Sequence, residues 1–221
     1  MKVKLFCRWS DYYDKWFDGD GYVWERQNEP NMDRATMMSR LLELGYMVPT
    51  HGIAASVIPK AIETYQTDNL YFIAHVDVNA SGGEGKVLIG AKACLNQFPA
   101  VFVTQFLGNI NARTYHSYRF LRVGHKAFGI KFSGSYWKAD YSKDTTYKIC
   151  CESVVDSYND ALPYVLYSID YVLFNGQSYA VDFNNAPHVG SMDIQSKMSG
   201  SEAAAALKEG IEYFKNKGLN Y

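Results

Sequence analysis

The segment Leu166–His188, LYSIDYVLFNGQSYAVDFNNAPH, decides how this chain folds. Two alternating, apolar-rich runs flank Asn175-Gly176, a dipeptide strongly typical of a tight β-hairpin turn. The second run ends with Asp182 and Asn184, which are two residues apart and therefore point to the same face of a strand. The segment thus predicts a hairpin that presents oxygen-bearing side chains on one face.

The register of the hairpin decides whether Asp170 joins this group. A plain two-residue turn continues into a register that leaves Asp170 facing away from Asp182. A three-residue loop that includes Phe174, with Gly176 at positive φ, shifts the pairing and brings both acids and Asn184 to one face. The second register would offer Mg²⁺ the carboxylate and amide oxygens that it prefers beside nucleotide phosphates, so the three-residue loop is the turn expected if these residues bind a metal. A surface hairpin whose polar residues face water is also compatible with the spacing.

The run SIDYVLFNGQSYAVDFNNAP resembles the closing motif of the ATP-grasp superfamily, in which an acidic strand residue precedes an acid-x-Asn-x-x-Pro pattern. Asp170, Asp182 and Asn184 fall on its three metal-ligand positions, and Pro187 completes it. Asp182 stands where the superfamily usually has Glu. The resemblance implies ATP and Mg²⁺ as cofactors. It also implies an α+β fold, in which two α+β lobes with antiparallel sheets clasp a nucleotide.

The segment DRATMMSRLLELGYMVPTHG, residues 33–52, carries a second part of the resemblance. Asp33 predicts a helix N-cap, the apolar spacing after it predicts the helix, and Gly45 predicts its end. In the superfamily a long basic side chain, commonly Lys, begins this helix and contacts the nucleotide. Arg34 occupies that position here.

Residues 70–89 predict a strand, a glycine-rich loop and a strand, an arrangement whose main-chain N–H groups can close over phosphates. The loop is neither a Walker A nor a dinucleotide motif, and a plain hairpin turn also fits it. The resemblance implies a mobile loop that covers the phosphates with Ser81, Gly82, Gly83, Gly85 and Lys86. His75 stands on the preceding strand where the superfamily usually has Lys, and a neutral imidazole is a weaker phosphate partner.

Residues 98–107 predict a buried strand. In the superfamily this strand leads into the interlobe linker, so the resemblance implies adenine contacts from Gln105, Phe106 and Leu107. The following run, 114–132, predicts a hairpin on which Arg119 and Arg122 differ in parity and cannot share a face. By resemblance, Arg119 and Lys131 are the catalytic cations that hold the phosphates and an acyl phosphate. Cations on a solvated strand face are the alternative.

Apolar spacing predicts further helices at 54–67, 91–96, 147–162 and 201–217. Residues 2–9 predict a strand, and the aromatic-rich stretch after it predicts packing against the core or, alternatively, a base-stacking surface. We expect three parts: an N-terminal strand and aromatic segment (1–31), a small lobe with the glycine-rich loop (32–103) and a large lobe with the metal-binding hairpin (104–221).

The composition argues against several classes of function. A net charge of −1 over 221 residues argues against an electrostatic nucleic-acid binder. The apolar runs are shorter than the roughly 20 residues that span a bilayer, so no membrane partner is expected. The four cysteines lack metal-type spacing and no signal peptide is visible, so we expect reduced thiols and a cytoplasmic location.

The resemblance covers residues 33–214 but not the additional N-terminal domain that supplies much of the acceptor site in most such ligases. We therefore expect a small-molecule or peptide acceptor, whose site is completed by a partner protein, by a second copy in a homo-oligomer or by the aromatic N-terminal segment. Two functions remain open. One is an ATP- and Mg²⁺-dependent ligase that joins a carboxylate to an amine or similar nucleophile through an acyl phosphate. The other is a non-catalytic ATP-binding or protein-interaction module, favoured by Arg34, His75 and Asp182.

Overall fold

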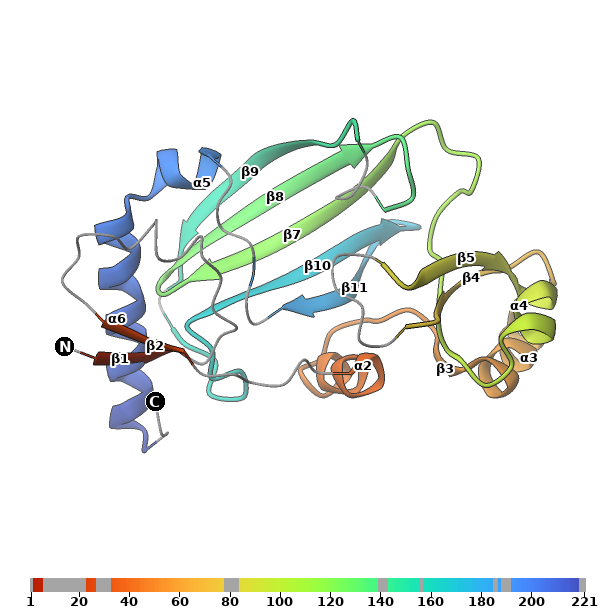
Figure 1. Cartoon of the computed structure of the whole chain (residues 1–221), viewed down its shortest axis with the longest axis horizontal. Helices are drawn as coiled ribbons and strands as arrows, with labels where there is room; N and C mark the ends of the chain where they lie inside the picture. The colour runs from red at the N-terminus through yellow and green to blue at the C-terminus, as the bar shows by residue number, and fades with distance from the viewer. Residues whose placement is uncertain are drawn as a thin grey trace.

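Two antiparallel sheets, each with its own helices, form the protein (Figure 1). The computed structural model describes residues 2–5, 23–26, 33–77, 84–138, 143–155, 157–184, 187 and 192–218. A short parallel pair, β1 (Lys2–Leu5) and β2 (Val23–Arg26), precedes the two sheets. The predicted α+β class is confirmed. The aromatic-rich stretch between β1 and β2 lies outside the described residues. Within those residues, no helix has the length and apolar character needed to cross a membrane.

The small lobe is a four-stranded sheet with the order β3-β6-β4-β5. Its elements are β3 (His51–Ile53), α3 (Ala54–Tyr65), β4 (Tyr71–His75), β5 (Lys86–Gly90), α4 (Ala91–Gln97) and β6 (Phe102–Gln105). Its core includes Ile58 of α3, Phe72 of β4 and Cys94 of α4, all fully buried. The helices predicted at 54–67 and 91–96 are confirmed. Because β6 ends at Gln105, this sheet extends past residue 103.

The large lobe is a five-stranded sheet with the order β11-β10-β7-β8-β9. Its strands are β7 (Tyr115–Val123), β8 (Lys126–Gly134), β9 (Thr146–Val154), β10 (Leu166–Phe174) and β11 (Gln177–Asn184). The predicted hairpins β7–β8 and β10–β11 are confirmed. The helix predicted at 147–162 is wrong, because its first half is β9. Tyr147 and Ile149 alternate onto the sheet face that also carries Phe132, and this stretch is rich in the Thr, Tyr, Ile and Val residues typical of strands.

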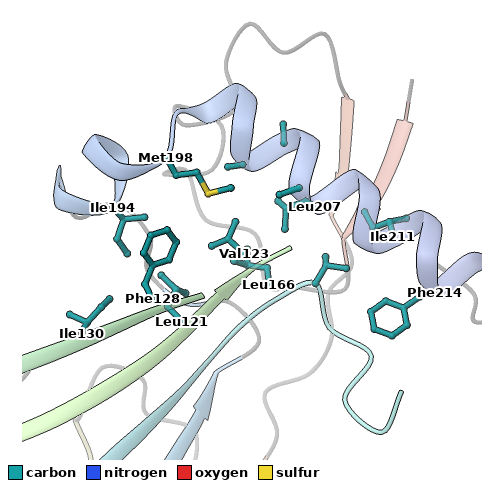
Figure 2. Packing of buried hydrophobic residues seen from close by; sticks show 14 residues of the cluster. Leu121, Val123, Phe128, Ile130, Leu166, Ile194, Met198, Leu207, Ile211 and Phe214 are labelled. Carbon is teal, nitrogen blue, oxygen red and sulfur yellow. The ribbon is translucent and has the colours of Figure 1, made fainter. Parts of the chain in front are cut away.

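One face of the large sheet is covered at its left end in Figure 1 by α5 (Met192–Lys197) and α6 (Gly200–Asn216). Ser199 caps α6 in a capping box with Glu202. Figure 2 shows Leu207 and Ile211 of α6 directed at Leu121 and Val123 of β7 and their neighbours. The close approach of α6 to the β7–β8 turn requires Gly124. Its φ is 58°, and a Cβ at this position would collide with the Ala206 carbonyl.

The opposite face of the large sheet is covered by α2 (Arg34–Glu43). Met38 and Leu41 of this helix are buried against Tyr167, Ile169 and Ala180 of the two hairpin strands. The predicted helix ends are confirmed: the Asp33 side chain accepts a hydrogen bond from the Thr36 N–H at 2.9 Å, and Gly45 follows the helix at φ 83°. The helix thus belongs with the large sheet, at the side nearest the small lobe.

The β10–β11 hairpin brings its two acids together by a different route from the predicted one. Its turn has two residues, with Asn175 at φ 50° and Gly176 at φ 76°, so the predicted three-residue loop is wrong, although the positive φ is confirmed. A β-bulge farther along then shifts the register between Asp170 and Tyr171. As a result, Asp170 stands directly opposite Asp182.

Candidate active site between the two lobes

The bulged hairpin places two carboxylates side by side on one face of the large sheet. Asp170 and Asp182 are cross-strand partners, and cross-strand partners lie on the same face. Asn184, two residues beyond Asp182, pairs with Ser168, two residues before Asp170. The three predicted metal-ligating residues therefore share a face. Within the described residues, no group of three His, Cys, Asp or Glu side chains is placed to hold a metal ion.

Asp170 is engaged by a guanidinium from the neighbouring central strand. Arg119 stands opposite Asp170 in the β7–β10 pairing and donates two hydrogen bonds to it, at 2.7 Å from Nε and 2.8 Å from Nη2. The guanidinium also lies 5.2 Å from the centre of the Phe132 ring. Side-chain exposure is only 15% for the arginine and 18% for the aspartate. We name this two-pronged contact the central pair.

Asp182 is engaged by a second guanidinium, from the start of α2. Arg34 donates hydrogen bonds from Nη1 and Nη2 to the two carboxylate oxygens, at 2.7 and 3.2 Å. Because β11 is the edge strand of its sheet, the side chain reaches Asp182 around that edge. The same edge is held to α2 by a hydrogen bond from the Phe183 N–H to the Met37 sulfur at 3.2 Å. We name the contact between Arg34 and Asp182 the edge pair.

The small lobe adds an imidazole and an ammonium group to this site. His75 and Lys86 are cross-strand partners in the β4–β5 pairing. His75 is 6% exposed, its Nε2 lies 3.2 Å from the Thr104 hydroxyl, and its ring lies 5.8 Å from that of Phe102. Burial, and then the positive charges of Arg34 and Lys86, lower the pKa of His75 to about 3. The imidazole is therefore neutral at physiological pH.

Asp182 experiences positive charge from three separate parts of the chain. Burial opposes its ionisation, but Arg34 of α2, Lys86 of β5 and Arg119 of β7 together lower its pKa below the usual value. The carboxyl is therefore ionised at neutral pH. Residues that are far apart in the sequence meet at this one carboxylate, which identifies the junction of the two lobes as the candidate site.

The linker strand contributes a buried amide. The Gln105 side chain is buried, and its Oε1 has no hydrogen-bond partner. The main-chain N–H of Gln105 donates to the Thr50 carbonyl at 2.7 Å, and that of Phe106 donates to the Tyr71 carbonyl at 2.8 Å. The N–H groups of these two residues are thus engaged within the protein. What they leave for a ligand is an acceptor on the Gln105 side chain.

The structure does not bring together the two predicted catalytic cations, Arg119 and Lys131. In the β7–β8 pairing Arg119 stands opposite Ile130, while Lys131 stands opposite Tyr118, with its Nζ 5.9 Å from the Tyr118 ring. Adjacent residues of a strand point to opposite faces, so Lys131 lies across the sheet from the two carboxylates. The parity rule that correctly separates Arg119 from Arg122 also separates Arg119 from Lys131, once the register is known.

The glycine-rich loop is described only where it joins its strands. Ser81, Gly82 and Gly83 lie outside the described residues, as do residues 78–80. Gly85 has φ 63°, and its carbonyl accepts a hydrogen bond from the Asp77 N–H at 3.2 Å. The predicted strand–loop–strand arrangement is confirmed by the pairing of β4 with β5.

Two polar residues of the site were not predicted. Thr104 holds His75, and Ser168 is buried beside Asp170 on the same face, with an Oγ that has no partner. Alternation along β10 would have indicated Ser168, because it is two residues from Asp170. Nothing in the sequence indicates the contact of Thr104, because the register of β6 against β4 is needed to find it.

Comparison with solved structures identifies the fold. The chain has the ATP-grasp fold, and the matching structures are ligases of that class. One is D-alanine–D-alanine ligase from Bacillus anthracis, with a TM-score of 0.51 and 11% identity over 85% of this chain and 69% of that one. Another is the ATP-grasp ligase PsnB, complexed with precursor peptide PsnA2 and AMPPNP, with a TM-score of 0.53 and 11% identity over 87% of this chain and 64% of that one. No protein-family model and no curated protein matches the sequence.

Proposed function

We propose that the protein is an ATP-dependent ligase that joins a carboxylate to an amine or similar nucleophile through an acyl phosphate. The observation that carries this proposal is the convergence of Arg34, Lys86 and Arg119 on Asp182, directly opposite Asp170. Cations beside paired carboxylates suit a metal–triphosphate group, because the carboxylates bind the metal and the cations bind the phosphates. The fold agrees with this chemistry, since the two similar structures named above are ligases.

The residues present fit ATP and Mg²⁺. Asp170, Asp182 and Asn184 offer only oxygen ligands, as Mg²⁺ requires. The partnerless Gln105 Oε1 can accept a hydrogen bond from the amino group of adenine, which would resolve the cost of burying it unpaired. When bound, Mg²⁺ neutralises phosphate charge and orients the transferred group.

The chain's own residues then act by position and charge. In the proposed reaction Arg34 exchanges its carboxylate partner for phosphate oxygens, which are equally suited to a two-pronged guanidinium contact, while Arg119 keeps Asp170 and adds its positive charge beside the phosphates. Lys86, next to the glycine-rich loop, adds a third positive charge from the small lobe. His75 stays neutral, so it positions its neighbours through Thr104 and Phe102 and adds no charge of its own. Catalysis by these residues is electrostatic.

The test is nucleotide-dependent product release. Native protein, incubated with Mg²⁺, ATP and pooled amino acids with acyl acceptors, is expected to release ADP faster than Asp182→Ala. The exposed ion pair of Asp160 with Lys217 provides a matched control, so Asp160→Ala should release ADP at the native rate. Equal release by native protein and Asp182→Ala would contradict the proposal.

The second candidate function is a nucleotide-binding module without catalysis. The observation favouring it is that guanidinium groups hold both candidate metal carboxylates, so each carboxylate has a positively charged partner within the chain. Such a module would bind ATP and release no ADP with any acceptor. Measuring ATP binding and ADP release on the same preparation separates the two candidates.

A further inference from the structure

The large sheet has a cavity on the face opposite the two ion pairs. Its volume is about 310 Å³. Residues from all five strands border it, among them Tyr118, Phe120, Gly129, Cys151, Tyr171 and Leu173, and Arg119 of the central pair borders it as well. The first six share one face by register, since Tyr118 pairs with Tyr171, and Phe120 pairs with Gly129, which pairs with Cys151.

The paired side chains of Arg119 and Asp170 point to the other face of the sheet, although Arg119 also borders the cavity. Arg119 and Asp170 immediately neighbour Tyr118 and Tyr171 in sequence, and neighbours in a strand point to opposite faces. A ligand over Tyr118 and Tyr171 therefore lies on the face opposite the side chains of Asp170 and Asp182. A ligand here is a second, separate ligand.

The shape of the cavity depends on a glycine and a bulge. A Cβ on Gly129 would collide with the Cys151 sulfur, so only glycine leaves the centre of the sheet open at this point. The β8–β9 register shifts between Gly129 and Ile130, which leaves Cys150 as the extra residue on β9. Two tyrosines, a phenylalanine and a leucine otherwise make the lining apolar and aromatic.

Two lysines lie on the same sheet face as the cavity, beyond the residues that border it. Lys131 has its Nζ 5.9 Å from the ring of Tyr118, and Lys148 is its direct cross-strand partner. Like charges directly opposed on a sheet repel each other. Among the described residues, no acidic side chain pairs with either lysine. An anion bound beside them would remove this repulsion.

We propose that this cavity binds a small apolar carboxylate, with its ring or chain over Tyr118 and Tyr171 and its carboxylate at Lys131 and Lys148. Apolar lining selects a mostly hydrocarbon body, and the lysine pair selects one negative end. This inference goes beyond the proposed ligase function and does not depend on ATP binding.

The test uses 3-phenylpropionate as the probe and the full chain with Cys150→Ser, which leaves Cys151 as the exposed thiol among the described residues. A saturating concentration of the probe is expected to slow the alkylation of Cys151, and peptide mass spectrometry measures the rate of this alkylation. Calorimetry should show affinity falling roughly tenfold in Lys131→Gln and in Lys148→Gln, because each loses a charge-assisted contact. Lys215→Gln, an exposed lysine on α6, is the matched control and should bind as the parent does.

Three results would overturn the proposal. One is unchanged Cys151 alkylation together with no calorimetric binding. Another is equal affinity for 3-phenylpropionate and its neutral amide, or equal affinity in Lys131→Gln and the parent. The third is binding of acetyl-Ala-Ala-Phe without binding of 3-phenylpropionate. That result would show that the cavity binds the C-terminal end of a peptide. Failure of ATP to bind would leave these outcomes unaffected, so the two proposals fail separately.

Discussion

The central pair and the edge pair have the same chemistry but different positions in the fold. Arg119 and Asp170 come from two adjacent interior strands and stand opposite each other in register. Arg34 and Asp182 come from a helix and an edge strand that lie 148 residues apart in the sequence. The aspartate of the central pair is 18% exposed, and that of the edge pair is 32% exposed.

The difference indicates which pair belongs to the framework, meaning that it mainly stabilises the fold, and which pair can open when a ligand binds. Opening the central pair strands two charges inside a five-stranded sheet, whereas opening the edge pair releases one side chain at the border of the two lobes. We therefore expect the central pair to dominate stability. The edge pair, which lies beside Lys86 and His75, should dominate the response to ligands and pH.

The largest expected effect comes from breaking the central pair on one side. Arg119→Met removes the guanidinium from the mostly buried Asp170 carboxylate, which should lower the free energy of unfolding by about 3 kcal/mol. Urea unfolding measures this loss. The double variant Arg119→Met with Asp170→Leu removes both charges and should regain most of the stability. A single variant within about 0.5 kcal/mol of native protein, the spread of ordinary surface changes, would show that the pair is not framework.

The second prediction concerns the imidazole beside the edge pair. The pKa of His75 is about 3 in the folded chain and near 6.5 when unfolded, so only the unfolded chain gains this proton as pH falls below about 6.5. Its contribution to stability is present at neutral pH and is lost on acidification, by about 2 kcal/mol between pH 7 and pH 5. Urea unfolding at the two pH values should show a smaller loss in His75→Gln. Equal losses in both proteins would mean that His75 does not titrate as described.

The smallest expected effect on stability comes from breaking the edge pair. Arg34→Gln should cost about 1 kcal/mol, because the pair is partly exposed. Its diagnostic effect lies in metal binding without nucleotide: Mn²⁺, followed by electron paramagnetic resonance, should bind more tightly once the guanidinium no longer competes for Asp182. Weaker Mn²⁺ binding than in native protein would show that Arg34 supports the metal site and does not compete with it.

Much of the fold was predictable because local signals agreed with the final packing. The Asp33 cap, the Gly45 stop, the Asn175-Gly176 turn and the terminal helix each follow from short-range chemistry. The stretch that became β9 was misassigned because its apolar spacing also fits a helix, and only pairing with β8 decides it. Tertiary pairing, which no local pattern contains, made that choice.

The sequence allowed the types of residue in the candidate site to be predicted, but it gave less information about how their side chains lie relative to one another. Asp170 and Asp182 were expected to converge, but the bulge that aligns them has no glycine or other signature in the sequence. Lys131 was expected beside Arg119, but its face depends on the register with β7. The contacts of Arg34 and Arg119 with the two carboxylates could not be predicted, because they depend on three-dimensional distances that residue spacing does not give.

Titration calorimetry of ATP, with and without Mg²⁺, tests the central claim most directly. Native protein should bind ATP more tightly when Mg²⁺ is present, and this metal dependence should disappear in Asp170→Asn and Asp182→Asn. Asp160→Asn, at an exposed ion pair outside the site, should retain it. If native protein binds no ATP, or if the two site variants keep the native metal dependence, then the junction between the two lobes is not a site for nucleotide and metal.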